Sequence, residues 1–170
     1  MPANPKIPAD LDKRLKGLRL LSLDVDGVLT DGGLYYADDG SQLRKFNVRD
    51  GMGMKQVMAA GVEIALITAS NTDAILKRAE GLGVAHVRMG ADDKVAALSD
   101  VCTKLGIDLA DVAHMGDDLN DLPVLGAVGL GMTVADGRPE VLAVAEFISD
   151  RAGGDGAVRD ICDRILKAKN

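Results

Sequence analysis

Aromatic side chains are scarce in this chain of 170 residues, which has no tryptophan, two tyrosines and two phenylalanines. Proteins that bind single-stranded nucleic acid stack its bases on aromatic rings, so we expect no such function here. Positive charge is also in the minority: 20 lysine and arginine residues face 26 acidic ones, and the net charge is −6 at pH 7. An acidic chain without a lysine–arginine block is poorly suited to general binding of nucleic acid or anionic membranes.

Cysteine is equally sparse, and long apolar runs are missing. Cys102 and Cys162 stand alone, outside any CxxC pair, and the two histidines lack metal-ligand spacing. A zinc site and a disulfide framework are therefore not expected, and the chain is predicted to be cytoplasmic. Residues 1–17 carry three prolines and no apolar segment of the kind found in signal peptides. The uncharged stretch at residues 124–135 is shorter than the roughly 20 residues that a membrane helix needs.

Short apolar runs alternate with helical patterns along the chain. This alternation predicts the α/β class, with a three-layer, mostly parallel sheet covered by helices on both faces. The length predicts a single domain over residues 18–170, after a mobile N-terminal extension over residues 1–17. We expect strands over 19–24, 62–68, 85–88, 112–115, 128–131 and 146–149, and helices over 51–60, 72–82, 93–105, 119–125, 138–145 and 157–167.

Residues 33–48 break this alternation. Their two β-rich arms flank the sequence Ala-Asp-Asp-Gly-Ser at residues 37–41. Asp-Gly between extended arms is typical of a β-hairpin turn. A hairpin is therefore predicted to project just after the first strand.

Polar side chains follow the predicted strands where each strand ends. Ligands of an open parallel sheet bind beyond the carboxyl ends of its strands, so we expect these side chains to form one site. They are Asp24 and Asp26 after the first strand, Thr68 at the end of the second, Lys94 after the third, and Asp117 and Asp121 after the fourth.

This set of side chains suits phosphoryl transfer. Asp24 and Asp26 lie two residues apart and point to the same side of an extended chain, so their pKa values are pushed apart. One can then act as a nucleophile while the other carries a proton. A phosphate facing several carboxylates needs a cation, and oxygen ligands favour Mg²⁺. Lys94 and Thr68 can hold the phosphoryl oxygens.

Each feature alone also has a structural interpretation. Asp-x-Asp is common in turns, a threonine often ends a strand, a lysine at a helix start is usually solvated, and GDDLND at residues 116–121 can cap a helix. Their common order, each at the exit of a strand, favours a catalytic site.

Four stretches of the chain resemble the motifs of the haloacid dehalogenase superfamily of phosphatases. They are DVDGVLTD (24–31), the threonine that closes VEIALIT (62–68), Lys94 and GDDLND (116–121). FNVRDG (46–51) and AGGDGAVR (152–159) are similar to segments of the 3-deoxy-D-manno-octulosonate 8-phosphate phosphatase family, and the resemblance covers residues from about 18 to 166.

The resemblance implies a role for each residue. Asp24 would form an aspartyl-phosphate, and Asp26 would protonate the sugar oxygen and then activate water. Thr68 and Lys94 would hold the phosphoryl group. Mg²⁺ would be bound by the side chains of Asp24 and Asp117 and the backbone carbonyl of Asp26, with Asp121 supporting the site. The substrate contacts would be Asn47, Val48, Arg49, Asp50, Gly51, Lys55 and Arg78, together with Lys94.

The spacing of the motifs also bears on assembly. Between Asp26 and Thr68, and between Thr68 and Lys94, the chain is too short for a cap domain, which leaves the site open to water. The resemblance implies a homotetramer in which the hairpin and the C-terminal tail close a neighbouring site. The alternative is that the apolar side chains of the hairpin pack on their own domain; these are Leu34, Tyr35, Tyr36, Leu43 and Phe46.

Two departures from the family pattern concern the substrate. Ser70 stands where the family has arginine, and Asp155 stands where it has arginine or lysine. The first expectation is 3-deoxy-D-manno-octulosonate 8-phosphate, and the alternative is a nine-carbon keto-sugar acid 9-phosphate. A receiver-like phosphoacceptor module is a third interpretation. It is disfavoured because the phosphorylated aspartate of receivers follows a later strand than their acidic pair. A non-catalytic sugar-acid binder would not need both Asp24 and Asp26.

Overall fold

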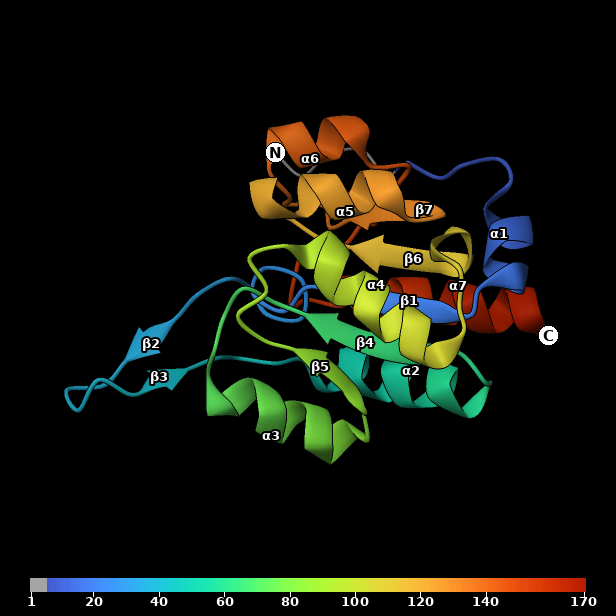
Figure 1. Ribbon diagram of the computed structural model, residues 1–170. Helices are drawn as coiled ribbons and strands as arrows, with labels where there is room; N and C mark the ends of the chain where they lie inside the picture. Colours follow the sequence, from blue (N-terminus) through green and yellow to red (C-terminus); the bar gives the residue numbers. More distant parts are fainter. Residues whose placement is uncertain (1–5) are drawn as a thin grey trace.

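A single parallel sheet organises the protein, whose computed structural model describes residues 6–170 (Figure 1). The six-stranded sheet has the order β5-β4-β1-β6-β7-β8, and all its pairings are parallel. The α/β class with a parallel sheet is therefore confirmed. The strands are β1 (Leu20–Leu23), β4 (Glu63–Ile67), β5 (His86–Arg88), β6 (Val112–Met115), β7 (Leu130–Thr133) and β8 (Phe147–Ile148).

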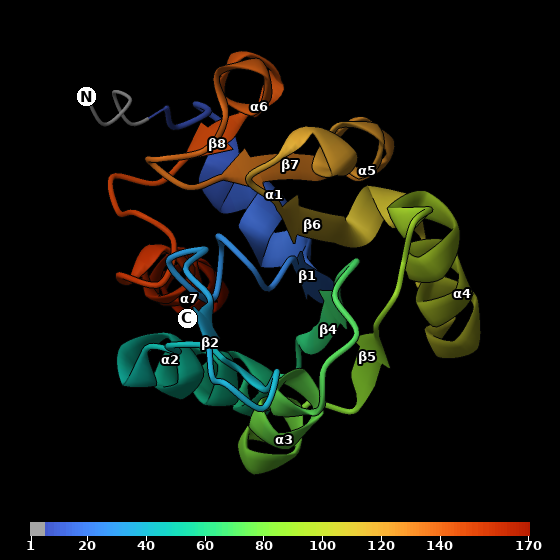
Figure 2. The ribbon, with the colours of Figure 1, turned by 90° about the vertical axis from the view of Figure 1, so that its left-hand side faces the viewer.

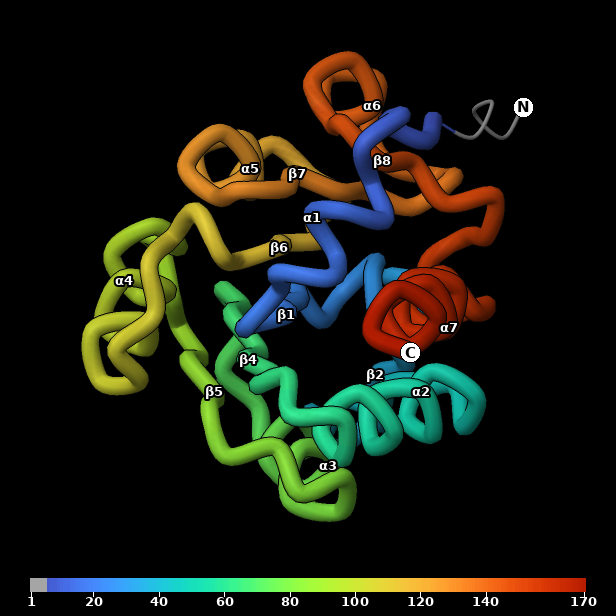
Figure 3. Tube along the Cα trace, turned by 90° about the vertical axis from the view of Figure 1, so that its right-hand side faces the viewer, coloured from blue at the N-terminus to red at the C-terminus, as the bar shows by residue number. Residues whose placement is uncertain are grey.

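Helices cover both faces of this sheet (Figures 2 and 3). Buried side chains of α1, α2, α3 and α7 share one core cluster, and those of α4 and α5 share the other. Among the described residues, only the hairpin and α2 lie between β1 and β4, so no cap domain is inserted there. The helices are α1 (Leu11–Gly17), α2 (Val48–Ala59), α3 (Asp73–Leu82), α4 (Lys94–Leu105), α5 (Leu122–Ala127), α6 (Pro139–Val144) and α7 (Ala157–Lys169), with 3₁₀ turns η1 (Leu109–Asp111) and η2 (Leu119–Asp121).

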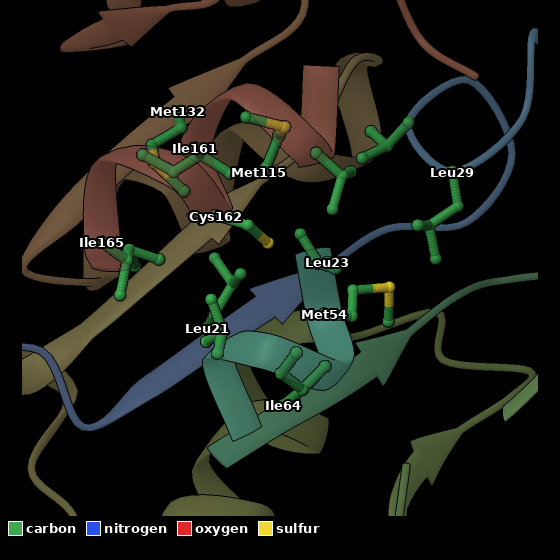
Figure 4. Packing of buried hydrophobic residues seen from close by; sticks show 14 of the residues in the cluster. Leu21, Leu23, Leu29, Met54, Ile64, Met115, Met132, Ile161, Cys162 and Ile165 are labelled. Carbon is green, nitrogen blue, oxygen red and sulfur yellow. The ribbon is translucent and has the colours of Figure 1, made fainter. Parts of the chain in front are cut away.

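The central strand β1 is buried along its whole length, as expected for a strand with helices on both sides. Leu21 and Leu23 belong to the same cluster as Met54 of α2 and Ile161 of α7 (Figure 4). Leu20 belongs to the opposite cluster. Burial of such side chains contributes about 1.5–3 kcal/mol each, and it holds the end of β1 rigidly in the middle of the sheet.

The predicted ranges and the observed elements differ at several ends. Helix α2 begins at Val48 rather than Gly51 because the Asn47 side chain caps it, accepting the backbone N–H of Arg49 at 2.8 Å. The helix predicted over 119–125 is split into η2 and α5. The strand predicted over 128–131 lies two residues later, as β7.

The predicted boundary at residue 18 is wrong, because α1 belongs to the folded body. Leu11 and Leu15 are buried in the same cluster as residues of α7. Further upstream, the backbone of Lys6 pairs with that of Ile148 at the edge of the sheet. An apolar spacing of four residues on a short helix explains this packing. The mobility predicted for residues 1–5 lies outside the described part of the chain.

A β-hairpin projects from the carboxyl edge of the sheet, as predicted (Figure 1). Its strands are short, β2 (Tyr35–Tyr36) and β3 (Gln42–Leu43), and Gly40 supplies the positive φ of +83° that the turn requires. Tyr35 and Tyr36 are each 67% exposed. The apolar arms therefore do not pack on their own domain, apart from Phe46, which packs against the core.

The C-terminal segment packs against its own domain, and its predicted part in closing a neighbouring site stays a prediction. The backbone N–H of Gly154 donates to the Val28 carbonyl at 2.9 Å, and Asn47 donates to the Gly154 carbonyl at 3.1 Å. The helix α7 that follows buries Val158 and Ile161 completely and lies beside α2 (Figure 3). Within residues 6–170, no helix combines the length and apolar character needed to cross a membrane. The cytoplasmic location remains a prediction.

Candidate active site

The catalytic residues predicted from the sequence converge at one edge of the sheet. The chain leaves β1 toward β4 and later returns to β6 on the other side, so β1 marks the topological switch point. Figure 2 views the molecule from the side toward which β4 and β6 point in Figure 1. A small pocket lies there, lined by Asp24, Asp26, Thr68, Ala69, Ser70, Asp117, Asp118 and Asn120.

Lys94 joins two of the carboxylates beneath this pocket. Its Nζ lies 3.1 Å from Asp24 Oδ1 and 2.6 Å from Asp121 Oδ1, and its side chain is buried. Burial alone would favour the neutral amine, but the charges of Asp24 and Asp121 outweigh it and raise the pKa of Lys94. The ammonium is thus a permanent positive charge at the first residue of α4.

Asp121 is the most heavily bonded of the acidic residues. Its Oδ2 accepts the backbone N–H groups of Asp117 at 3.0 Å and Asp118 at 3.3 Å, while Oδ1 faces Lys94 and His114. The His114 ring in turn bonds to Ser22, deep in the sheet. Burial opposes ionisation of Asp121, but His114 and Lys94 prevail and lower its pKa to about 2. Asp121 is therefore ionised and orients both Lys94 and the backbone that carries Asp117.

The pKa values of Asp24 and Asp117 are raised, unlike that of Asp121. Burial, followed by the charge of Asp121, raises the pKa of Asp24 to about 6. Burial, followed by the charge of Asp24, raises the pKa of Asp117 to about 8. Carboxylate oxygens of Asp24, Asp117 and Asp121 lie within 4.8 Å of one another. The crowding of like charges is what a bound cation would relieve.

The oxygens at this cluster suit a divalent metal. Asp117 Oδ1 is buried and has no hydrogen-bond partner among the described residues. Both oxygens of Asp121 are already engaged, so Asp24 and Asp117 are the carboxylates with capacity left for a ligand. All-oxygen coordination is the preference of Mg²⁺. The residues present therefore fit the predicted metal.

Two glycines allow the acidic residues to approach so closely. Gly27 has a φ of +89°, and a Cβ there would lie 2.0 Å from Asp117 Oδ2. A Cβ on Gly116 would lie 2.2 Å from Asp121 Cγ. A side chain at either position would displace a carboxylate, which explains why glycine follows Asp26 and precedes Asp117 in this chain.

Thr68 and Asp26 complete the pocket on the β4 side. Thr68 is buried, and its hydroxyl oxygen accepts the backbone N–H of Ser70 at 3.1 Å, which leaves its proton free to donate. Asp26 lies at the rim and is 28% exposed. The Ser70 hydroxyl donates to Asp26 Oδ2.

The sequence analysis missed Arg44, which reaches the rim of this pocket, as well as Asp118 and Asn120 in its lining. Arg44 Nε lies 2.6 Å from Asp26 Oδ1 and its Nη2 lies 3.3 Å from Asp26 Oδ2. Arg44 lies between Leu43 and Lys45, which are both exposed. Successive side chains of an extended arm point to opposite faces, so the pattern predicts that Arg44 points to the face opposite Leu43 and Lys45. The pattern does not say what it faces, because that depends on how the hairpin folds back over the loop after β1.

The predicted substrate contacts other than Lys94 lie outside the lining of this pocket. Asn47 caps α2, and buried Asp50 accepts the backbone N–H of Arg159 at 2.8 Å, so both have structural partners. Arg78 donates to the Asn47 carbonyl at 3.1 Å. A second pocket lies between α2 and α3, and Lys55 and Arg78 are among its lining residues, with Val48, Gly51, Met52, Gly81 and Leu82. A third pocket lies over the start of α7 and includes Arg49 and Asp155. Binding of substrate by these residues stays a prediction.

Comparison with known proteins identifies the family. A sequence profile described as haloacid dehalogenase-like hydrolase matches residues 89–161. The 3-deoxy-D-manno-octulosonate 8-phosphate phosphatase of Escherichia coli K12 is 42% identical over 163 residues, which are 96% of this chain and 87% of that protein. The chain belongs to the 3-deoxy-D-manno-octulosonate 8-phosphate phosphatase family. The resemblance inferred from the motifs is thereby confirmed.

Solved structures of this phosphatase family share the fold. The enzyme of Yersinia pestis is 39% identical, with a TM-score of 0.93 over 96% of this chain and 88% of that one. The enzyme of Moraxella catarrhalis, solved with magnesium ion, phosphate ion and KDO, is 39% identical, with a TM-score of 0.91 over 94% of this chain and 91% of that one.

Proposed function

We propose that the protein is a Mg²⁺-dependent phosphatase that hydrolyses 3-deoxy-D-manno-octulosonate 8-phosphate through an aspartyl-phosphate. The observation that supports it most is the buried Asp24–Lys94–Asp121 arrangement beside Asp117. It offers one carboxylate to a phosphorus atom and a fixed cation to the phosphoryl oxygens. The names of the family members above support the substrate.

The metal belongs to this arrangement. Asp24 and Asp117 would hold Mg²⁺, which supplies positive charge to the transferring phosphoryl group and lowers the repulsion between it and the carboxylates. The orphaned Oδ1 of Asp117 supports this assignment.

The residues of the chain then divide the reaction into two displacements. A carboxylate oxygen of Asp24 attacks phosphorus, the bond from phosphorus to the sugar oxygen breaks, and Asp26 gives its proton to that oxygen. Water next attacks the phosphorus of the aspartyl-phosphate and gives a proton to Asp26, which releases inorganic phosphate and restores Asp24. The Thr68 hydroxyl and the Lys94 ammonium hold the phosphoryl oxygens in both steps.

The surroundings of Ser70 do not replace the guanidinium expected at that position. Nη2 of Arg44 lies 3.3 Å from the Ser70 hydroxyl oxygen, but the Arg44 side chain is buried and paired with Asp26. Arg44 is therefore not proposed as a ligand for the substrate.

We also propose that the enzyme is a homotetramer in which the hairpin of one copy covers the site of another. The pocket has no lid from its own chain among the described residues, and the hairpin carries exposed apolar side chains that would be buried by such a contact. The C-terminal tail, which is tied to its own domain at Gly154, would contribute to the same contact.

A screen of phosphorylated sugars, with eight- and nine-carbon keto acids included, tests the substrate. We expect the eight-carbon acid to give the highest kcat/KM, and a higher value for the nine-carbon acid would replace it. Asp24→Asn should abolish turnover of every phosphate ester while leaving the circular dichroism spectrum unchanged. Retained turnover would remove Asp24 as the nucleophile, and a phosphorylated Asp24 that persists for hours would favour a receiver-like module instead.

A further inference from the structure

The side chain of Arg44 has an unusual environment for an arginine on a projecting hairpin. Neighbouring side chains of the hairpin face solvent, with Tyr36 67% and Leu43 62% exposed, but the Arg44 side chain is only 2% exposed. A buried guanidinium is costly unless its donors are satisfied. The partners that satisfy it should therefore explain why it is there.

Apart from Gln42 of its own arm, 3.5 Å from Nη1, the hydrogen-bond partners of Arg44 lie at the catalytic pocket or in the loop that leads from it to α3. Nε and Nη2 take the two oxygens of the Asp26 carboxylate in a fork, at 2.6 and 3.3 Å. Nη1 donates to the hydroxyl oxygen of Thr72 at 3.1 Å, and Nη2 also reaches the Ser70 hydroxyl at 3.3 Å. Thr72 stands at the N-cap position of α3 without making a cap hydrogen bond, so its hydroxyl is available for Arg44.

Asp26 and Asp24 are thus oriented by separate groups. Asp24 forms an ion pair with Lys94, which lies at the start of α4. Asp26 is held by Arg44 from the hairpin and by Ser70 from the loop after β4. Within the described residues, the hydrogen bonds to the Asp26 side chain come from these two residues, so its orientation depends on the hairpin.

We infer that Arg44 is a positioning residue, which fixes the orientation of the Asp26 carboxyl group for proton transfer. This inference rests on the proposed function, in which Asp26 exchanges a proton with the leaving oxygen and then with water. Displacement of a reacting group by about 1 Å can lower a rate by roughly 100-fold, so an unrestrained Asp26 should act slowly. Arg44 need not touch the substrate for this effect.

Kinetics of p-nitrophenyl phosphate hydrolysis with saturating Mg²⁺ test the inference. Hydrolysis of the aspartyl-phosphate by water is common to every substrate, so the identity of the sugar does not matter. Arg44→Met should lower kcat by roughly 10- to 100-fold and leave KM within about twofold. In a background of Asp26→Asn, the same substitution should change kcat by less than about twofold, because the residue through which Arg44 acts is already disabled.

Lys45→Met is the matched control. Lys45 is the next residue of the same arm, and its ion pair with Asp31 at 2.8 Å is exposed to solvent. Lys45→Met should have a kcat within about twofold of the parent enzyme and the same melting temperature. An equal loss of kcat in Lys45→Met and Arg44→Met would mean that any disturbance of the hairpin slows the enzyme, and it would overturn the inference.

Three further results would overturn it. Arg44→Met could lower kcat by the same factor in the parent and in the Asp26→Asn background, or its effect could appear mainly in KM. In either case Arg44 would act on the substrate directly. The third is a crystal structure of Arg44→Met in which the Asp26 carboxylate keeps its orientation; we expect it to turn or to take several rotamers. Absence of any Mg²⁺-dependent hydrolysis by the unmodified enzyme would instead refute the proposed function.

Discussion

Asp121→Asn should destabilise the protein more than its small change in shape suggests. Oδ2 of Asp121 accepts two backbone N–H groups, and Oδ1 accepts from the Lys94 ammonium at 2.6 Å. An asparagine has one oxygen and one NH₂ group. Whichever way it is turned, its NH₂ faces either the N–H groups of Asp117 and Asp118 or the ammonium of Lys94, so buried donors lose their acceptor.

Two terms set the size of the effect. The pKa of Asp121 falls from its ordinary value of 3.8 to about 2, which corresponds to about 2 kcal/mol of stability at neutral pH. A buried donor without an acceptor costs about 1–3 kcal/mol more. The expected loss is therefore about 3–5 kcal/mol, or about 6–20 °C in melting temperature for a domain of this size.

Urea unfolding at pH 7 in the presence of a chelator measures this loss, with Asp118→Asn as the control. Asp118 is exposed and caps η2, where asparagine is as good as aspartate, so that variant should lose less than about 0.5 kcal/mol. Because the folded pKa of Asp121 lies below the unfolded one, its contribution is complete above about pH 4 and is lost as the pH falls through about 2. Equal losses in the two variants, or a gap between parent and Asp121→Asn that widens on acidification, would refute the reasoning.

Three other outcomes are expected. Gly27→Ala should weaken Mg²⁺ binding by at least about tenfold, measured by calorimetry, because the added Cβ would collide with the Asp117 carboxylate. Gly40→Ala is the control: Gly40 has a similar positive φ, but a Cβ there would have no atom within 4 Å, so Mg²⁺ binding should not change. Mg²⁺ must displace the proton that the raised pKa of about 8 keeps on Asp117, so its affinity should strengthen between pH 6 and 8 with proton release, and a pH-independent affinity would contradict the site. Replacing Tyr35 and Leu43 together by serine should yield a smaller species in light scattering while the monomer stays folded, whereas an unchanged mass would exclude the hairpin contact.

The pocket at the carboxyl edge of the sheet was predictable because its residues are tied to strand ends. Asp24, Thr68 and Asp117 each follow an apolar run short enough to be a buried strand, and parallel strands bring their carboxyl ends to one edge. Residue type, order and spacing along the chain were sufficient for that step. The motif resemblance then added the roles of the individual residues.

Other features depend on where distant segments meet. Arg44 looks like an ordinary hairpin arginine until the hairpin is placed against the loop that carries Asp26. Likewise, α1 carries only two core leucines, and the sequence predicts an extension there. Its burial depends on contacts with α7, nearly the whole chain away. No local pattern encodes such long-range neighbours.

Local sequence thus specifies the alternation of strands and helices, the class of sheet and the chemical groups at its carboxyl edge, since each follows from short-range periodicity. Which carboxylate is ionised, which one is free for a metal and which hydrogen bonds orient Asp26 follow instead from the packed chain. Burial and the distances between Asp24, Lys94, Asp117 and Asp121 set those energies, and both come into being only when strands far apart in the chain lie side by side.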